Sequence, residues 1–520
     1  MKKTLRSLKL ACLAAVSMLV VSCGGGADYR NLLPADSFMT MSVNPASLLQ
    51  KSDAGDIGQH PLFIRLKAEL DKAEGITAEE KEYLLALLKN PCESGVDLKK
   101  DLFFFMSMDG AMQSPNVRGG MLLPVGDKAK LDALLARIGE KSGIAPRHEG
   151  GISVIALGED SSVSGLCAYN DVAVMLYFAQ GSPESALDAV KKLFAQKCGE
   201  SLMGDKVVAD QLSEKNDINM VMAYSALASM LDSNPMVGSM PMMDALKGAT
   251  LASSVNFEKG RIVCDAAMSY KESEQKMMDF YAYVKPQTGA LLRYVPRNTI
   301  GAMAYGLDGE KMYSVFSAMP GYGMLMANPM VKQVMDAFSG DCVISFSGIT
   351  PDRYPVASLL AQVKDPAVLQ TIVSNLSGMP IQKAGEGEYT ISMGGVTVMF
   401  GVKGDVLYCT TDAVVKSALD GADIESLASM SKIFKGQSGS FYVDFEGVNA
   451  LTAQLVGGNV APQVEAALSV LAMFEDLEAY GTMKGGTAVV NMTDKEQNSF
   501  KTICDKIGEL IRLYVPEANL

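Results

Sequence analysis

Two stretches of this chain open in the same way: residues 29–38 read YRNLLPADSF and residues 294–300 read YVPRNTI. Each places a tyrosine shortly before a proline and then enters an apolar, strand-like segment. The elements that follow recur in the same order: a strand with a helix behind it, a meander and a helix, a strand that enters a helix, and a closing hairpin. Recurrence at this scale is typical of an internal repeat. We therefore predict two tandem similar halves, residues 29–285 and 293–515.

The matching segments also indicate the fold class. Residues 101–107 (DLFFFMS) correspond to 341–347 (DCVISFS), and residues 217–224 (DINMVMAY) correspond to 439–445 (GSFYVDF). Strands that come as hairpins and meanders pair antiparallel. We therefore expect an α+β fold in which each half is a mainly antiparallel sheet with packed helices. The run Phe103-Phe104-Phe105 predicts a strand that is covered on both faces.

Two helix starts are marked by capping residues. Thr77-Ala78-Glu79-Glu80 has the spacing of a capping box ahead of a leucine-rich stretch. Ser182-Pro183 places a capping hydroxyl before a first-turn proline. Both patterns predict helices that begin at the following residue.

The N-terminus has the pattern of a secretory signal. Lys2, Lys3, Arg6 and Lys9 precede an apolar stretch at residues 10–21 that is too short to span a bilayer. The stretch ends Val-Val-Ser-Cys at Cys23, which resembles a bacterial lipobox. We expect a signal peptide at residues 1–22, and a lipidated Cys23 with a flexible glycine-rich tether at residues 23–28. The protein would then reach the membrane through its lipid anchor.

The lipobox, the short tether and the Tyr-x-x-x-x-Pro opening with its second copy resemble the domain-of-unknown-function 4836 family of bacterial envelope lipoproteins, found in Gram-negative gut anaerobes. The second opening departs from the pattern, because one residue rather than four separates Tyr294 from Pro296. The resemblance implies an outer membrane lipoprotein and assigns no activity, so no functional residues are carried over. Surface-exported lipoproteins carry an acidic run after the cysteine. Here Asp28 is the one acid in the tether, which favours the periplasmic face over the cell surface.

Composition excludes some functions. The formal net charge is −13, which disfavours binding to nucleic acid. The chain has only two histidines, and it contains no nucleophile elbow, phosphate-binding loop, zinc-protease motif or cysteine cluster with zinc spacing. We therefore predict no catalytic residue, no metal site and no cofactor, and expect a non-enzymatic protein.

Two cysteines lie in polar loops after predicted helices. An oxidising envelope would permit a disulfide between Cys92 and Cys198; the alternative is that both thiols are free. Four others, Cys167, Cys264, Cys342 and Cys409, lie in strand-like runs and are expected to be small buried apolar residues.

Methionine is unusually frequent, at 34 of 520 residues. Two proline- and glycine-containing segments concentrate it, and we predict that at least one of them is an exposed apolar interaction loop. The alternative is that methionine replaces leucine as core filler. The methionines of these segments are Met236, Met240, Met242, Met243, Met319, Met324 and Met326.

The sequence as a whole indicates a lipid-anchored envelope protein that binds or scaffolds an unidentified protein or hydrophobic ligand. A carrier or chaperone for hydrophobic ligands is the first alternative, and it requires a cavity. A hydrolase of envelope glycans that uses paired carboxylates is the second, and it requires two acids in a cleft.

The lipid anchor gives the first prediction. Changing Cys23→Ala should move the protein from the membrane to the soluble fraction without altering its melting temperature, because the tether lies outside both predicted halves. Fractionation, mass spectrometry and thermal unfolding test this. Acyl chains on the variant would contradict the lipobox assignment.

Overall fold

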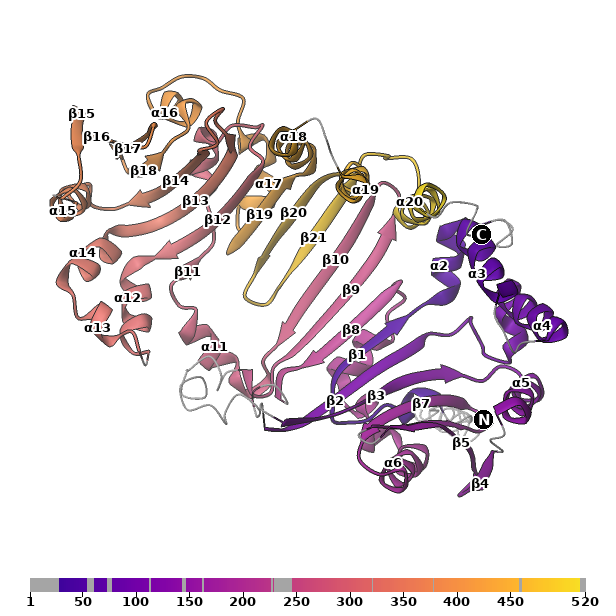
Figure 1. Ribbon diagram of the computed structural model, residues 1–520. Helices are drawn as coiled ribbons and strands as arrows, with labels where there is room; N and C mark the ends of the chain where they lie inside the picture. Colours follow the sequence, from indigo (N-terminus) through magenta and orange to yellow (C-terminus); the bar gives the residue numbers. More distant parts are fainter. Residues whose placement is uncertain are drawn as a thin grey trace, which may run out of the picture.

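One antiparallel sheet runs through the whole molecule and twists along its length (Figure 1). The structure is a computed structural model. It describes residues 28–514 except residues 54–59, 73–76, 112–113, 143–145, 161–162, 226–227, 229–245, 320, 377 and 458–460. None of the helices in this described part combines the length and apolar character needed to span a bilayer.

The N-terminal part contributes the first ten strands. These are β1 (Ser37–Val43), β2 (Leu102–Ala111), β3 (Ser114–Pro124), β4 (Arg147–Glu149), β5 (Ile152–Asp160), β6 (Val163–Tyr169), β7 (Ala173–Gln180), β8 (Ile218–Ala223), β9 (Thr250–Glu258) and β10 (Arg261–Ser269). The helical elements are η1 (Tyr29–Leu32), α2 (Pro45–Ser52), α3 (Pro61–Lys72), α4 (Ala78–Lys89), η3 (Pro91–Ser94), α5 (Lys128–Ser142), α6 (Pro183–Ala195), η4 (Cys198–Glu200), η5 (Leu202–Gly204), α7 (Lys206–Leu212), η6 (Lys271–Ser273) and α11 (Glu274–Phe280).

The C-terminal part contributes the remaining strands. These are β11 (Val284–Lys285), β12 (Gly301–Asp308), β13 (Phe338–Ile349), β14 (Pro355–Val363), β15 (Ile381–Gly385), β16 (Glu388–Met393), β17 (Val396–Lys403), β18 (Val406–Thr410), β19 (Gly439–Asp444), β20 (Phe474–Thr482) and β21 (Gly485–Met492). The helical elements are η7 (Ala290–Tyr294), α12 (Gly309–Ser317), α13 (Gly323–Met326), α14 (Pro329–Ala337), α15 (Val368–Asn375), α16 (Ala413–Leu419), η8 (Leu427–Met430), α17 (Ser431–Phe434), α18 (Phe445–Val456), α19 (Pro462–Leu471) and α20 (Ser499–Tyr514).

The strand order is the same when it is followed inward from either end of the sheet. One end runs β4-β5-β6-β7-β3-β2-β1-β8-β9-β10. The other runs β15-β16-β17-β18-β14-β13-β12-β19-β20-β21. β10 and β21 then pair antiparallel along a central seam, from Arg261 opposite Asn491 to Ala267 opposite Gly485. The predicted α+β class with mainly antiparallel pairing is confirmed, but this seam makes one continuous sheet instead of a separate sheet in each half.

The two openings noticed in the sequence make similar local contacts. Pro34 forms an isolated bridge with Ser201, and Pro296 forms one with Ser426. Beside these bridges, the Leu202 backbone N–H donates to the Leu33 carbonyl at 3.1 Å, and the Leu427 N–H donates to the Val295 carbonyl at 2.9 Å. Each opening therefore ties its first strand to a short helical segment much later in the chain.

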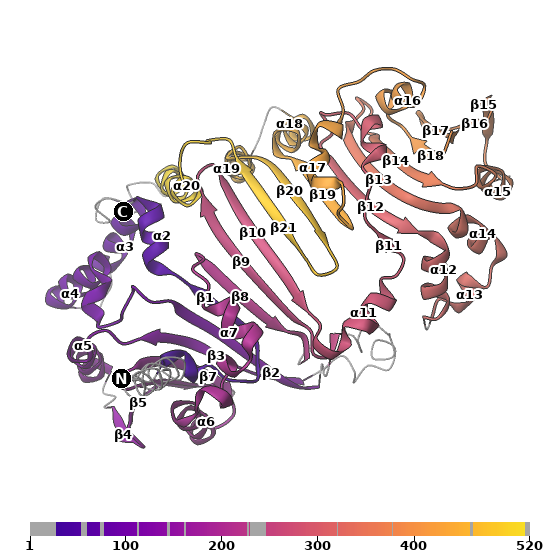
Figure 2. The same ribbon diagram turned by 180° about the vertical axis from the view of Figure 1, so that it is seen from behind.

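Two large apolar clusters lie on the same side of the sheet. The first is formed by strands of the N-terminal part with η1, α6, η5 and α7, and includes Phe103, Leu122 and Leu212. The second is formed by strands of the C-terminal part with η7, α16, η8 and α17, and includes Leu360, Tyr408 and Phe434. Figure 2 shows α7 and α17 in front of the sheet on this side.

The predicted helix starts are confirmed. The Thr77 hydroxyl accepts from the Glu80 N–H while the Glu80 carboxylate accepts from the Thr77 N–H, so both halves of the capping box are formed. Ser182 caps α6 by accepting from the Ser185 N–H.

Burial divides the strand phenylalanines into two groups, and this gives the second prediction. Phe103 is 0% exposed, whereas Phe178 is 45% exposed. Phe103→Ala should lower the free energy of unfolding by about 3–5 kcal/mol because it leaves a cavity in the core. Phe178→Ala should lower it by less than about 1 kcal/mol, because its ring is already partly in water. Urea unfolding of both variants measures the difference, and equal losses would contradict this division.

Candidate functional site

The pairing register assigns every strand side chain to one of two faces. Residues directly opposite each other in an antiparallel pair share a face, and successive residues alternate. Val343 and Ala304 lie opposite each other on the side of the two apolar clusters, which we call the core face. Met303 lies opposite both Ile344 and Phe441 on the other side, which we call the open face.

Charge is segregated between these faces. We consider the central strands β1–β3, β7–β10, β12–β14 and β18–β21. Every Asp, Glu, Lys and Arg on them lies at a core-face position, except Glu475 in the bulge at the start of β20. The core-face residues are Asp109, Arg118, Glu258, Arg261, Asp265, Asp308, Asp341, Asp444, Asp476 and Glu478. Apart from that bulge, the open face of these strands carries no ionisable Asp, Glu, Lys or Arg.

The open face also carries exposed apolar side chains. The large apolar strand residues that are clearly exposed all lie on it: Leu157, Val163, Phe178, Met303, Tyr305, Ile344, Leu359 and Phe441. The methionines of β1–β3, β8, β10 and β12 also lie there: Met39, Met41, Met106, Met108, Met121, Met220, Met222, Met268 and Met303. Contiguous exposed apolar surface is uncommon on soluble proteins and marks binding sites.

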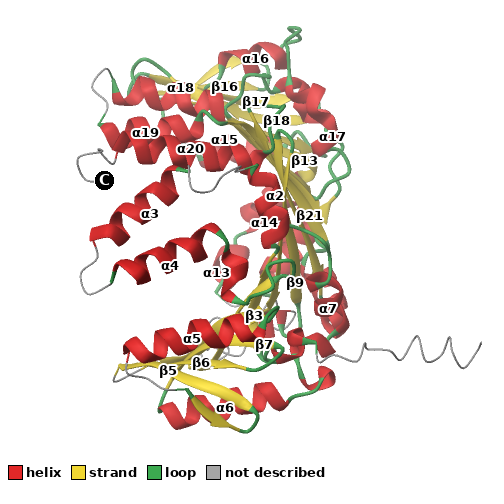
Figure 3. Ribbon diagram, turned by 90° about the vertical axis from the view of Figure 1, so that its right-hand side faces the viewer, coloured by secondary structure: helices red, strands yellow, loops and turns green. Residues whose placement is uncertain are grey.

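Among the described residues, helices cover the open face only around its margins. At one end α5 packs Leu131 and Leu135 against Cys167 and Val174. At the other end α14 and α15 pack over Val363 and Phe400. Along one long side, Phe500 of α20 contacts Phe257 with ring centroids 5.0 Å apart, and Phe445 of α18 contacts Phe474 at 5.7 Å. Figure 3 shows α5, α18 and α20 on this side of the sheet and α7 and α17 on the other.

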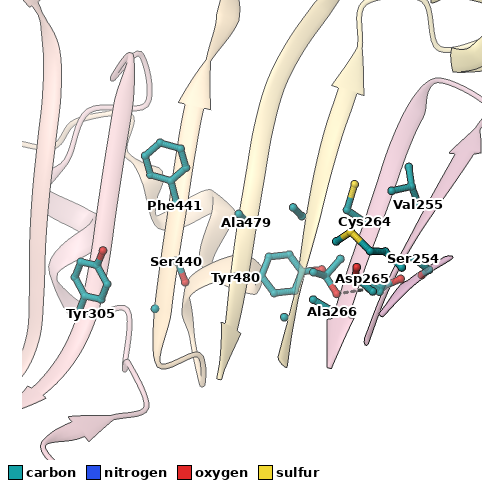
Figure 4. A pocket seen from close by; sticks show the side chains of 16 residues that line it. Ser254, Val255, Cys264, Asp265, Ala266, Tyr305, Ser440, Phe441, Ala479 and Tyr480 are labelled. Atoms are coloured by element: carbon teal, nitrogen blue, oxygen red, sulfur yellow. Dashed lines mark hydrogen bonds between the residues drawn. The ribbon is translucent and has the colours of Figure 1, made fainter. Parts of the chain in front are cut away.

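A hollow of about 590 Å³ crosses the seam in the uncovered centre (Figure 4). It spans β8, β9, β10, β21, β20, β19 and β12. Its open-face residues are Met220, Ser253, Val255, Cys264, Ala266, Gly486, Ala488, Ala479, Gly439, Phe441 and Tyr305. The other lining residues, Ser254, Asp265, Ser440, Tyr480 and Thr487, alternate with these and direct their side chains to the core face. The hollow is therefore a feature of the open face.

Small side chains form the floor of this hollow, and larger ones stand at its ends. Ala266, Ala479 and Ala488 lie in the middle, between Met220 on β8 and Phe441 on β19. At the far end the Tyr305 ring lies over Gly439, where a Cβ would be only 3.3 Å from the ring. Glycine at this position therefore lets the aromatic wall lie close to the strand.

The hollow crosses the seam between β10 and β21. Cys264 lies opposite Ala488 and Ala266 lies opposite Gly486 on the open face, and Asp265 lies opposite Thr487 between them on the core face. The Thr487 hydroxyl donates to the Asp265 carboxylate at 2.6 Å on the core face. Each half of the molecule thus supplies one half of the hollow.

The cysteines singled out in the sequence differ in their exposure to solvent. Cys23 lies outside the described residues. Cys92 on η3 and Cys198 on η4 are free, exposed thiols in the structure. The expectation of burial is confirmed for Cys167, whereas Cys264 and Cys342 are half-buried and Cys409 is exposed on the open face.

The predicted methionine loops are only partly described. Met236, Met240, Met242 and Met243 lie outside the described residues. In the second segment Met324 is 95% exposed, Met319 is half-buried and Met326 is 6% exposed. The methionines of the open face were missed, although Met39 and Met41, Met106 and Met108, and Met220 and Met222 each show the two-residue spacing of a strand face.

The hollow contains one thiol, that of Cys264. Burial raises the pKa of the Cys264 thiol, and the neighbouring Asp265 charge adds to this, so the thiol stays protonated at neutral pH and is a poor nucleophile. Among the described residues, no group of three or more His, Cys, Asp or Glu side chains is placed to hold a metal ion.

Comparison with known proteins identifies a family. A family model described as "Domain of unknown function (DUF4836)" matches residues 29–436. The chain belongs to this family. No curated protein matches it. A solved structure titled "Structure of crystal form I of TP0453" is similar to this chain at 10% sequence identity. The match covers 44% of this chain and 98% of that chain, with a TM-score of 0.20.

Two core-face carboxylates give the third prediction. Burial raises the pKa of both Asp476 and Glu478, and the Asp476 charge raises that of Glu478 further. The folded state therefore binds the Glu478 proton more tightly than the unfolded state, and this contribution to stability is lost as pH rises through the raised pKa. Glu478→Gln should accordingly gain stability relative to the parent, by less than about 1 kcal/mol, between pH 4 and pH 7. Thermal unfolding across this range tests it, and a relative loss toward pH 7 would contradict the assignment.

Proposed function

We propose that this protein is a lipid-anchored protein of the bacterial cell envelope that binds an apolar ligand on the open face of its sheet. The observation that supports this proposal is a wide apolar face with a hollow in it, whose central strands carry no Asp, Glu, Lys or Arg outside the β20 bulge. Leaving apolar surface in water forgoes roughly 25 cal/mol per Å², and an apolar ligand recovers that free energy. This favours the carrier reading over a purely scaffolding role.

The size and composition of the hollow support a ligand site. Its volume of about 590 Å³ lies within the range of roughly 300–1,000 Å³ typical of small-molecule sites. Methionine side chains adapt to ligands of different shape, and nine of them lie on the open face. A methionine-rich face is suited to a group of related ligands rather than to one rigid molecule.

The position of the tether is compatible with an accessible open face. The described chain begins at Asp28 and continues into η1, whose Tyr29 and Leu32 pack in the core-face cluster. The proposed anchor at Cys23 therefore joins the body on the side opposite the open face. An outer membrane protein held in this way, with the periplasmic face favoured, would keep the hollow directed away from its own anchor.

An internal duplication is part of the same proposal. The shared strand order, the matching Pro34 and Pro296 bridges and the pairing of β10 with β21, the last strand of each order, support two repeats, at residues 29–285 and 293–515. A ligand site on the seam would then be a product of the duplication, since each repeat supplies half of it.

The carboxylate hydrolase is the weaker candidate. Asp476 and Glu478 have raised pKa values, as a catalytic acid requires, but they lie on the core face and do not line the hollow.

Neighbouring alanines on β10 provide the fourth prediction, a matched test of the site. Ala266 lines the hollow, and Ala267 is exposed on the core face. In the soluble Cys23→Ala protein, Ala266→Asp should weaken binding of the aromatic anion 1-anilinonaphthalene-8-sulfonate at least about tenfold, because a carboxylate in the hollow loses its hydration when the rings cover it and repels the sulfonate. Ala267→Asp should change the affinity less than about twofold.

Fluorescence titration measures both affinities, and circular dichroism establishes that both variants are folded. Equal affinities for the two folded variants would contradict the assignment of the ligand to the open face.

A further inference from the structure

We infer that the ligand is an unbranched hydrocarbon chain, namely the acyl chain of a lipid. This rests on the proposed function and specifies its ligand class. Three features of the hollow carry the inference: its lack of polar partners, the complete pairing of its floor strands, and its length across the sheet.

The first feature is the small number of polar groups. Among the open-face side chains that line the hollow, the polar groups are the Ser253 hydroxyl, the Cys264 thiol and the Tyr305 hydroxyl. Protein interfaces carry about one hydrogen bond per 100–200 Å². A polar group that is buried without a partner costs about 1–3 kcal/mol. A peptide brings a donor and an acceptor with nearly every residue, whereas the methylenes of an acyl chain bring none.

The second feature is the pairing of the floor. β9, β10, β21, β20 and β19 each pair with a strand on both sides. A peptide that binds by adding a strand needs an unpaired sheet edge, and the hollow contains no such edge. Contacts to the floor are therefore made through apolar side chains alone.

The third feature is the length and shape of the floor. The hollow crosses seven adjacent strands. Six inter-strand spacings of about 4.8 Å make a trench of about 29 Å. One acyl layer of a bilayer is about 15 Å deep, so an extended chain fits along the trench with room to spare. The row of Ala266, Ala488 and Ala479 leaves the middle of the trench free of large side chains.

The absence of charge on the open face is consistent with this ligand. A carboxylate or phosphate headgroup would find no cation on the central open-face strands, so the headgroup would stay in solvent. Affinity should therefore depend on the chain and only weakly on the headgroup.

The test uses the soluble Cys23→Ala protein and saturated fatty acids of 8 to 18 carbons below their critical micelle concentrations, with isothermal titration calorimetry as the readout. Each added methylene should strengthen binding about fourfold until the trench is filled. Ala266→Leu should weaken binding of the 16-carbon acid at least about tenfold and that of the 8-carbon acid less than about threefold. Ala267→Leu on the core face is the control and should leave both affinities unchanged.

Two further arms separate the source and class of the ligand. Vesicles of phosphatidylethanolamine with a radiolabelled acyl chain test whether the chain is taken from a diacyl lipid; uptake blocked by Ala266→Leu supports the inference, as free-acid binding does. An acetylated, amidated octapeptide of alternating leucine and serine tests the rival class.

Peptide binding without fatty acid or lipid binding would overturn the acyl-chain inference while leaving the proposed function intact. Fatty acid binding that is insensitive to chain length or to Ala266→Leu would also overturn it. Failure of fatty acids, peptide and the fluorophore together would remove the proposed function as well.

Discussion

The pairing of β10 with β21 is the interaction on which the architecture depends. It joins two half-sheets edge to edge over Arg261–Ala267 and Gly485–Asn491 and so leaves no free edge at the centre of the molecule. The two core clusters and their helices lie on either side of this seam, on the core face. Close packing keeps β21 free of large side chains here: a Cβ on Gly485 would clash with the Ala266 carbonyl oxygen across the seam, and one on Gly486 would lie 2.6 Å from the Tyr480 carbonyl oxygen on β20. Small residues at the seam and large ones beside it produce the hollow.

Charge placement explains why this sheet can present an apolar face and still carry a large net charge. Ionisable residues on the central strands lie at core-face positions or at the β20 bulge, where they form pairs such as Arg118 with Asp36 and Arg261 with Glu258. The open face is left to methionine, alanine, cysteine and aromatic residues. Such a surface discriminates against charged and strongly hydrated molecules because they would lose hydration without gaining partners.

The sequence predicts the strands better than it predicts what covers them. Phe103, Phe104 and Phe105 place apolar side chains on both faces of their strand, which predicts that both faces are covered. In the structure Phe103 and Phe105 are buried in the core, whereas Phe104 is half-buried on the open face. The difference arises because the described helices on the open face, α5, α14, α15, α18 and α20, cover its margins. Capping signals at Thr77 and Ser182 were readable because they depend on neighbours a few residues away. The seam joins residues more than 200 positions apart, and the hollow depends on it, so the site could not be located from local pattern. The methionine excess predicts loops where proline and glycine lie beside the methionines, whereas the alternating pairs such as Met39 with Met41 and Met220 with Met222 lie on strands of the open face.

The most direct test of the account is an experimental structure of the lipidated protein purified from its native membranes in a detergent with a branched or ring-based apolar group. The account predicts continuous, unbranched density on the open face that crosses the seam between Met220 and Phe441, above Ala266 and Ala488. An open face filled only by ordered water, or a partner chain that forms hydrogen bonds along it, would contradict the claim that this sheet holds an apolar chain.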